Sequence, residues 1–181
     1  MSITLILGGA RSGKSRFAQE LAAKPGKKVL FVATGESLDE EMRARIDTHK
    51  KSRPASWRTL EAPTNVARAL RSEIGDAEVV IIDCITLLVS NLMGDENTGV
   101  STWEKEVSAE IKSLIALLKN SKANFIIVSN EVGLGLVPTT PVGRAYRDIL
   151  GMANQMLAQD ADEVYLMVAG IPVALKGAHS R

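Results

Sequence analysis

Short apolar runs alternate with amphipathic segments along the chain. A continuous apolar run of about 4 to 8 residues is typical of a strand buried on both faces, whereas apolar residues three or four positions apart form one face of a helix. The apolar runs predict strands at 3–7, 29–34, 78–85, 125–129, 163–168 and 172–176, with a more exposed strand at 57–61. The periodic segments predict helices at 14–23, 37–51, 66–74 and 101–118, and a last helix that ends near residue 159.

Polar residues mark where two of these helices begin. Ser37 and Glu40, like Ser101 and Glu104, have the S-x-x-E spacing of a capping box, so each pair is predicted to start a helix. The segment 94–101 combines glycines with short polar residues and is predicted to be a loose loop. It is therefore a candidate mobile segment.

Strands that alternate with helices are typical of an α/β fold, in which a mostly parallel sheet carries helices on both faces. The two last strands, at 163–168 and 172–176, are close enough in sequence to form an antiparallel hairpin at the end of the chain. At 181 residues, the chain is long enough for one full core. We therefore expect a single domain over residues 1–181.

Charge and cysteine content indicate which kinds of ligand and which cellular compartment fit the sequence. Twenty-two basic and 21 acidic side chains leave a net charge of +1, and neither sign forms a run that suits nucleic acid or a membrane surface. No apolar segment reaches the roughly 18 residues of a membrane span. These features predict a cytoplasmic protein with a small-molecule ligand. Cys84, the single cysteine, is expected to be a buried core residue, with a reactive thiol as the alternative.

The most informative motif follows the first apolar run. It matches the phosphate-loop pattern G-x-x-x-x-G-K-[ST], set between a strand and a helix, and consists of Gly8, Gly9, Ala10, Arg11, Ser12, Gly13, Lys14 and Ser15. In such a loop the backbone N–H groups point at a phosphate, the lysine reaches the outer phosphates and the serine hydroxyl can bind Mg²⁺. The alternative, a glycine-rich turn without a ligand, does not require the whole pattern. With the strand order above, this motif predicts a three-layer, RecA-like P-loop NTPase fold.

Two further strands end in polar residues that are expected at the same edge of the sheet. Asp83 follows four apolar residues, as in a Walker B strand, and is placed to bind Mg²⁺ directly or through water. The alternative is that Asp83 caps the next turn. Ser129, Asn130 and Glu131 likewise follow an apolar strand, where they either face the site or bond the turn that follows.

His49 is one of two histidines and lies among basic residues on the predicted helix at 37–51. A neutral imidazole can attack phosphorus to form a phosphoramidate, and Arg45, Lys50 and Arg53 could hold a phosphate chain beside it. From position alone, a solvent-exposed histidine near a helix end is the favoured interpretation.

Blocks of residues along essentially the whole chain resemble one enzyme family. The most selective are Arg45-x-x-x-His49-Lys50-x-x-Arg53-Pro54 and Asn130-Glu131-Val132-Gly133. In these the sequence resembles the bifunctional adenosylcobinamide kinase/adenosylcobinamide-phosphate guanylyltransferases of cobalamin biosynthesis. Further residues carry the resemblance: Gly8 to Arg16, Val32-Ala33-Thr34, Asp39 to Met42, Trp57-Arg58-Thr59, Asp83 to Thr86, Asn91-Leu92, Val137-Pro138, Arg147-Asp148, Asn154-Gln155 and Ala161 to Val164.

The resemblance implies a role for individual residues. The histidine that matches His49 becomes guanylylated in this family, so His49 is the implied nucleophile, with Lys14 as a second catalytic residue. The implied nucleotide-binding residues are the phosphate loop, Asp83 and Glu61. Mg²⁺ is implied as the cofactor, held by Ser15 and Asp83.

The implied reaction has two halves. A hydroxyl of adenosylcobinamide first takes the γ-phosphate of ATP or GTP. GMP is then transferred from GTP, through a guanylyl-histidine, to give adenosylcobinamide-GDP. The resemblance also implies a homotrimer that acts on a small corrinoid substrate, and the charge balance described above predicts no nucleic-acid partner.

Two other functions fit the residues by themselves. A small-molecule kinase would use the phosphate loop and Asp83 and leave His49 inert. A nucleotide-switched binding module would instead order the loop at 94–101 for a partner protein.

Overall fold

Seven strands form one sheet in the computed structural model, which describes residues 1–23, 26–36, 40, 53–94 and 98–177. The strand order is β3-β2-β4-β5-β1-β6-β7, and every neighbouring pair is parallel except β6 and β7. The strands are β1 (Ile3–Gly8), β2 (Val29–Ala33), β3 (Arg58–Glu61), β4 (Val79–Asp83), β5 (Asn124–Val128), β6 (Glu163–Val168) and β7 (Ile171–Lys176). The predicted mostly parallel sheet is therefore confirmed.

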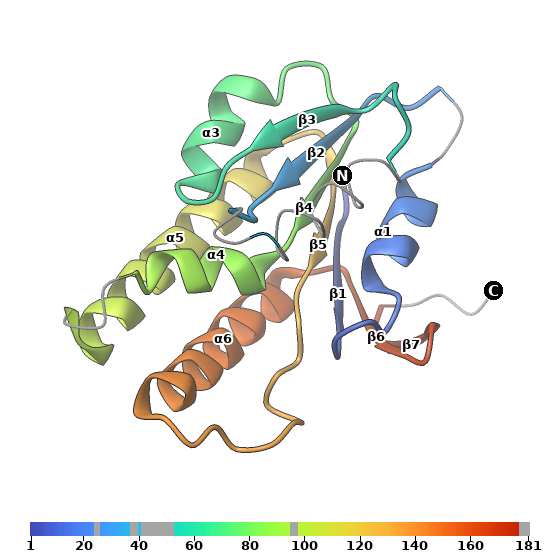
Figure 1. Cartoon of the computed structure of the whole chain (residues 1–181). Coiled ribbons are helices and arrows are strands. Elements are labelled where there is room, and N and C mark those ends of the chain that lie inside the picture. The colour runs from blue at the N-terminus through green and yellow to red at the C-terminus, as the bar shows by residue number, and fades with distance from the viewer. Residues whose placement is uncertain (24–25, 37–39, 41–52, 95–97, 178–181) are drawn as a thin grey trace.

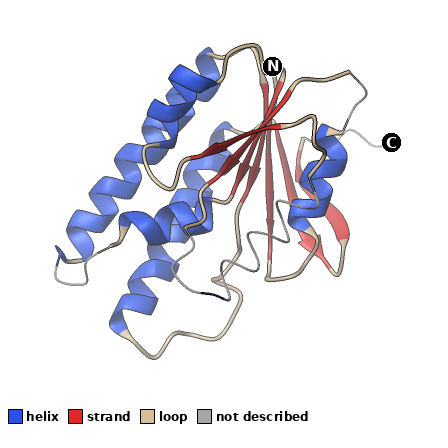
Figure 2. Cartoon of the chain, turned by 45° about the horizontal axis from the view of Figure 1, so that its top comes forward, coloured by secondary structure: helices blue, strands red, loops and turns tan. Residues whose placement is uncertain are grey.

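Helices cover both faces of this sheet, which gives three layers (Figures 1 and 2). On one face lies α1 (Lys14–Ala22); on the other lie α3 (Val66–Glu73), α4 (Ile85–Leu92), α5 (Val100–Asn120) and α6 (Pro141–Asp160). Within the described ranges, none of these helices combines the length and the apolar character needed to cross a membrane.

Neighbouring residues of a strand belong to different cores, because successive side chains point to opposite faces of a sheet. Leu5 packs in the larger core, with apolar residues of α3 to α6, whereas Ile6 packs in a smaller core with Ala18 and Ala22 of α1. The central strands β1 and β2 are buried along their whole length. This explains why they read as continuous apolar runs rather than as alternating ones.

The C-terminal hairpin is also confirmed. Strands β6 and β7 pair antiparallel, and the two residues between them, Ala169 and Gly170, both have positive φ, at 51° and 83°. Positive φ at both turn positions matches the right-handed twist of the paired strands.

β3 is confirmed as the exposed strand of the parallel set.

The strand predicted at 78–85 is shorter than expected. β4 ends at Asp83, and Ile85 already begins α4, a helix that the sequence analysis did not predict. The apolar run continues from β4 into α4, since this helix is buried against the sheet and its neighbours, so hydrophobicity alone did not separate the two elements. Cys84 lies between them, half-buried at the margin of the smaller core, so the expectation of a buried core cysteine is confirmed only in part.

The start predicted at Ser101 is also wrong. α5 begins at Val100, and its N-cap is Gly99, which has a φ of 87° and makes no side-chain cap hydrogen bond. A glycine in this conformation ends the loop earlier than the capping-box pattern indicated. The helix predicted at 37–51, with the capping pair Ser37 and Glu40, falls outside the described residues apart from residue 40, and so does 95–97 of the predicted loop.

Candidate functional site

The phosphate loop joins the buried end of β1 to the start of α1. Gly8 and Lys14 are buried, whereas Gly9, Ala10 and Arg11 are exposed at the surface. The N-cap of α1 is Gly13, with a φ of 96° in the left-handed region that favours glycine. The exposed backbone of the loop and the N-terminus of α1 thus lie together, an arrangement that favours anions.

The Lys14 ammonium lies against the loop that carries it. Nζ donates to the carbonyl oxygen of Gly8 at 3.0 Å and to that of Gly9 at 2.6 Å. Burial lowers the pKa of Lys14, while the nearby Cys84 and Asp83 act in the opposite direction. Asp83, at the end of β4, therefore lies within electrostatic reach of the lysine.

The turn of the C-terminal hairpin packs directly on the phosphate loop. The Gly170 N–H donates to the carbonyl oxygen of Ser12 at 3.0 Å. A Cβ on Gly13 would lie 3.2 Å from the Gly170 Cα, and one on Gly8 would lie 2.7 Å from the Met167 carbonyl oxygen. The glycines of the motif thus serve close packing as well as backbone conformation. This contact could not be predicted from the sequence, because nothing in the motif indicates which distant segment supports it.

Two carboxylate residues flank one small residue at the carboxyl edge of the sheet. Ala33 of β2 is the register partner of Glu61 in β3 and of Asp83 in β4. Register partners in adjacent strands point to the same face, and strands lie about 4.8 Å apart, so about 10 Å separates the backbones that bear the two carboxylates. The sheet therefore brings together two of the predicted nucleotide-binding residues.

Arg53 lies beside this pair of carboxylates. Its guanidinium carbon is 3.6 Å from the centroid of the Phe31 ring, and Phe31 shares the Ala33 face of β2. Burial lowers the pKa of Arg53, whereas Asp83 and Glu61 act to raise it. Within the part of the chain that the structure describes, the buried Nε and NH1 atoms have no hydrogen-bond partner.

A surface hollow of about 440 Å³ opens at this point. Both Arg53 and Glu61 line it, and the full lining is Arg53, Pro54, Ala55, Trp57, Thr59 and Glu61. The hollow is thus lined by a cation next to a carboxylate. The N–H donors of a guanidinium suit phosphate oxygens.

The polar residues after β5 are used mainly within the fold. Ser129 Oγ donates to Asn154 Oδ1 at 2.7 Å, and Asn154 Nδ2 donates to the Asn130 carbonyl oxygen at 3.0 Å. Glu131 Oε1 accepts the Gly133 N–H at 2.9 Å. Glu131 therefore bonds the turn, as one of the two interpretations left open by the sequence expected, whereas Ser129 bonds Asn154 of α6.

His49, Arg45 and Lys50 lie outside the described residues. The described part of the predicted basic block begins at Arg53, which follows them in the sequence and lies at the carboxyl edge with Glu61 and Asp83. The implied nucleophile therefore stays a prediction.

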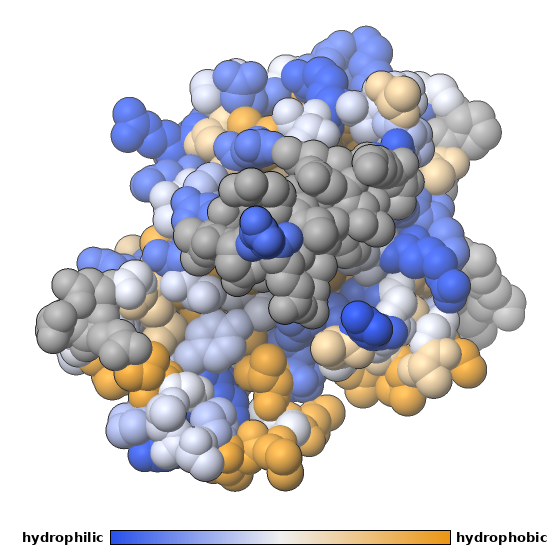
Figure 3. Space-filling view, in the orientation of Figure 1, coloured by the Kyte–Doolittle hydropathy of each residue, from blue (hydrophilic) through white to orange (hydrophobic). Residues whose placement is uncertain are grey.

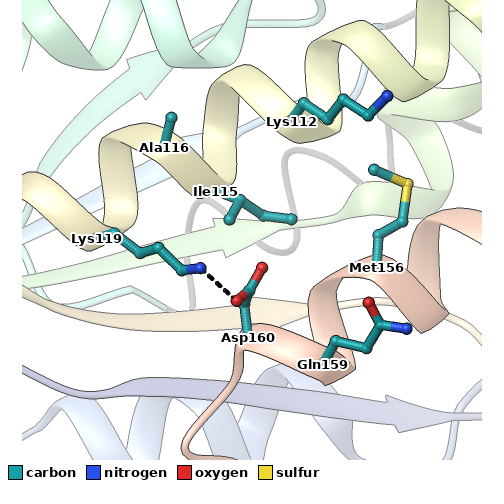
Figure 4. A pocket seen from close by; sticks show the side chains of 7 residues that line it. All are labelled: Lys112, Ile115, Ala116, Lys119, Met156, Gln159 and Asp160. Carbon is teal, nitrogen blue, oxygen red and sulfur yellow. Dashed lines mark ion pairs between the residues drawn. The ribbon is translucent and has the colours of Figure 1, made fainter.

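A second hollow, of about 300 Å³, lies between α5 and α6 (Figure 4). Lys119 Nζ and Asp160 Oδ1 form an ion pair across it at 2.5 Å. The residues that line the hollow belong to the C-terminal halves of α5 and α6, and these helices lead into the first residues of β5 and β6. The hollow therefore lies toward the amino ends of the strands. It is therefore at the opposite edge from the phosphate loop, and parallel α/β sheets bind ligands at the carboxyl edge.

Exposed apolar side chains gather on two segments beside the phosphate loop. They lie over the loop between β5 and α6 and over the β6–β7 hairpin, along the lower part of Figure 3. Leu136 is 97% exposed in the first segment, and Ile171 is 65% exposed in the second. The other members are Leu134, Val137, Val168, Val173 and Leu175. Apolar surface of this extent is typical of an interaction site.

Comparison with known proteins places this geometry in context. The model of the family described as cobinamide kinase / cobinamide phosphate guanyltransferase matches residues 4–175. The chain is 42% identical over 179 residues to the bifunctional adenosylcobalamin biosynthesis protein CobU of Escherichia coli, covering 95% of this chain and 98% of that protein. The CobU protein of Salmonella typhimurium has the same identity and coverage. CobP of Pseudomonas aeruginosa is 42% identical over 173 residues, 96% of each chain.

A solved structure extends the comparison to the fold. The crystal structure of the RadB recombinase superposes on 91% of this chain and 73% of its own, with a TM-score of 0.50 at 15% sequence identity. At that identity the likeness concerns the fold alone. It agrees with the RecA-like P-loop architecture predicted from the sequence.

Proposed function

Since the chain belongs to the cobinamide kinase / cobinamide phosphate guanyltransferase family, we propose that it uses one nucleotide site for two successive transfers to a corrinoid. In the first, adenosylcobinamide is phosphorylated by ATP or GTP. In the second, GMP passes from GTP to adenosylcobinamide phosphate and gives adenosylcobinamide-GDP. The observation that carries the proposal is the gathering of Lys14, Asp83, Glu61 and Arg53 at the carboxyl edge of the sheet.

For the kinase half, the phosphate loop from Gly8 to Ser15 binds the triphosphate and Lys14 neutralises charge on the transferred γ-phosphoryl group. The corrinoid hydroxyl forms a new P–O bond, loses its proton, and the bond to the β-phosphate oxygen breaks. The Lys14 ammonium needs only to leave the Gly8 and Gly9 carbonyl oxygens to reach a phosphate. Both carbonyls keep a backbone partner, since Gly8 accepts the Glu131 N–H and Gly9 accepts the Ser12 N–H.

Ser15 and Asp83 are the residues that would hold Mg²⁺, which when bound supplies charge neutralisation at the phosphates. Their hydroxyl and carboxylate oxygens are the ligand type that Mg²⁺ prefers. Among the described residues, no group of three or more His, Cys, Asp or Glu side chains is placed to hold a metal by itself. Phosphate oxygens and water would therefore complete the coordination, as is usual for Mg²⁺ bound with a nucleotide.

For the guanylyl half, a ring nitrogen of His49 attacks the α-phosphorus of GTP. A P–N bond forms, the bond to the β-phosphate oxygen breaks, and pyrophosphate leaves. The phosphate of adenosylcobinamide phosphate then attacks the same phosphorus and releases the histidine. Arg53, four residues after His49, offers two buried N–H donors to the phosphate chain during these steps.

We further propose that the active form is a cytoplasmic homotrimer of single-domain subunits spanning residues 1–181. The exposed apolar residues of the edge strand β7 support a contact between subunits, since Ile171, Val173 and Leu175 are 45–65% exposed. An unpaired apolar edge strand is otherwise an aggregation hazard.

The proposal is tested with Mg²⁺ and GTP labelled at the α-phosphate. The wild type is expected to acquire label that is stable to alkali and labile to acid, as a histidine phosphoramidate is, and His49→Ala is expected to acquire none. The chain has two histidines, so His179→Ala is the matched control and should label as the wild type does. A folded wild type that binds GTP without labelling would instead favour the kinase without nucleotidyl transfer.

A further inference from the structure

A single hydroxyl fastens the residue that follows Asp83. Thr34 Oγ1 donates to the Cys84 carbonyl oxygen at 2.7 Å and accepts the Cys84 N–H at 2.8 Å. Thr34 is fully buried and directly follows Ala33, the residue between the two carboxylates. The ends of β2 and β4 are therefore held together at the position where Asp83 leaves the sheet.

Asn91 of α4 fastens the same edge from the other side. Its Nδ2 donates to the Thr34 carbonyl oxygen at 2.8 Å and to the Pro63 carbonyl oxygen at 2.9 Å. Both N–H bonds of one amide are thus used, one toward the segment after β2 and one toward the segment after β3. The side chain thus links the segments that follow β2 and β3 to α4, the helix that follows β4.

Each bonded residue lies one or two positions beyond one of the paired residues Glu61, Ala33 and Asp83. Thr34 follows Ala33, Cys84 follows Asp83, and Pro63 is two residues beyond Glu61. We propose that Asn91 is a positioning residue that fixes the separation of Glu61 and Asp83 and so shapes the site for Mg²⁺ and nucleotide. This inference rests on the proposed function, but it adds a residue that touches neither ligand.

The chemistry of the bond explains the choice of residue. Two carbonyl oxygens need two donors, and a primary amide supplies both from one nitrogen in a fixed plane. Aspartate has the same shape but no donor, and its charge would face the two carbonyl oxygens. Serine keeps one donor at most. Removal of a residue that hydrogen-bonds a metal ligand directly typically changes metal affinity by about 10- to 100-fold, and Asn91 acts one bond further out, so the lower end of this range is expected.

The test compares Asn91→Asp with Asn120→Asp. Asn120 is the matched control because its Nδ2 also donates to a carbonyl oxygen, that of Ala116 at 2.7 Å, but at the exposed end of α5. Binding of a non-hydrolysable ATP analogue is measured by calorimetry across a series of Mg²⁺ concentrations, and folding is monitored by circular dichroism. Asn91→Asp is expected to weaken Mg²⁺-dependent binding about tenfold or more, and Asn120→Asp less than twofold.

A purely structural role would lower the thermal midpoint of Asn91→Asp and leave binding to the folded protein unchanged, and that result would overturn the inference. If Asn91→Asp does not fold, Asn91→Ser is judged by the same binding criterion. Failure of the proposed function is seen separately: a wild type that binds the analogue but transfers nothing to the corrinoid contradicts the function and leaves the test of Asn91 intact. A wild type that binds no nucleotide contradicts both.

Discussion

The guanidinium group of Arg53 stacks on the ring of Phe31, with its central carbon 3.6 Å from the ring centroid. The ring lies against the cation, and this cation–π contact offsets part of the cost of burial. Asp83 and Glu61 lie close enough to favour the charged form of Arg53. Contacts of this kind hold an arginine in place, and such preorganisation would reduce the entropy lost in the phosphate binding proposed above.

The first prediction concerns this stack. Arg53→Lys keeps the charge but loses both the planar contact with Phe31 and the forked donors, so we expect nucleotide affinity to fall about tenfold. Calorimetric titration with a non-hydrolysable GTP analogue measures the effect. Arg68→Lys, on the exposed surface of α3, is the control and should bind as the wild type does. If both variants bound the analogue with equal affinity, Arg53 would not belong to the nucleotide site.

The second prediction separates activity from stability at Lys14. Burial lowers the pKa of this lysine, which means that its charged form is less favourable in the folded protein than in the unfolded chain. Lys14→Met is therefore expected to unfold at the same temperature as the wild type or higher, while the rate of phosphoryl transfer falls about 100-fold or more. Thermal denaturation and initial rates measure the two effects.

The control for Lys14 is Lys112→Met on α5, which should leave the transfer rate unchanged because Lys112 lines the hollow at the opposite edge of the sheet. A large loss of stability in Lys14→Met would show that the Gly8 and Gly9 carbonyl oxygens depend on the ammonium group. Their second partners, the N–H groups of Glu131 and Ser12, argue against this outcome.

Much of the fold could be predicted because pattern and chemistry agree locally. The phosphate loop can be identified from its own eight residues, and each buried strand from one continuous apolar run. Each of these signals is contained within a short stretch of sequence. α4 was missed for the same reason: its burial extends the apolar run of β4 past Asp83 and hides the helical period.

The candidate site was less predictable, because it depends on which distant segments meet. Asp83 could be assigned from the end of its strand, but no local pattern shows that Asn91 reaches the Pro63 carbonyl oxygen or that Gly170 supports Ser12. These contacts follow from strand order. Sequence separation conceals them, although the residue types, an amide and a turn glycine, are suited to the roles they take.

The third prediction tests the packing of the hairpin turn on the phosphate loop. Gly13→Ala places a Cβ 3.2 Å from the Gly170 Cα at a φ of 96°, so we expect the free energy of unfolding to fall by about 1–2 kcal/mol. Nucleotide affinity should fall with it. Chemical denaturation of the wild type and of Gly13→Ala, each with and without nucleotide, gives the free energy of unfolding and the nucleotide affinity.

Gly151→Ala is the matched control for Gly13→Ala. Gly151 lies inside α6, and a Cβ there meets nothing within 4 Å. An alanine in a helix interior is expected to raise the free energy of unfolding by about 0.5–1 kcal/mol. If the two variants changed stability in the same direction, the close approach of Gly13 and Gly170 would not be the cause.

The last prediction concerns the Cys84 thiol, whose pKa is raised from 9.0 to about 11, chiefly by burial and then by the neighbouring Asp83 carboxylate. At pH 8 a shift of this size lowers the thiolate fraction about 100-fold, so alkylation by iodoacetamide should be slower by about that factor than in the denatured chain. Because the folded-state pKa is the higher one, the stabilising contribution is complete below pH 9 and is lost as the pH rises through about 11. Mass spectrometry of the single cysteine, followed from pH 7 to 11, measures the rate directly, with the guanidinium-denatured protein as control. Alkylation at the rate of the denatured chain at pH 8 would mean that the thiol is solvated, and that the edge of the sheet at Asp83 is open in solution.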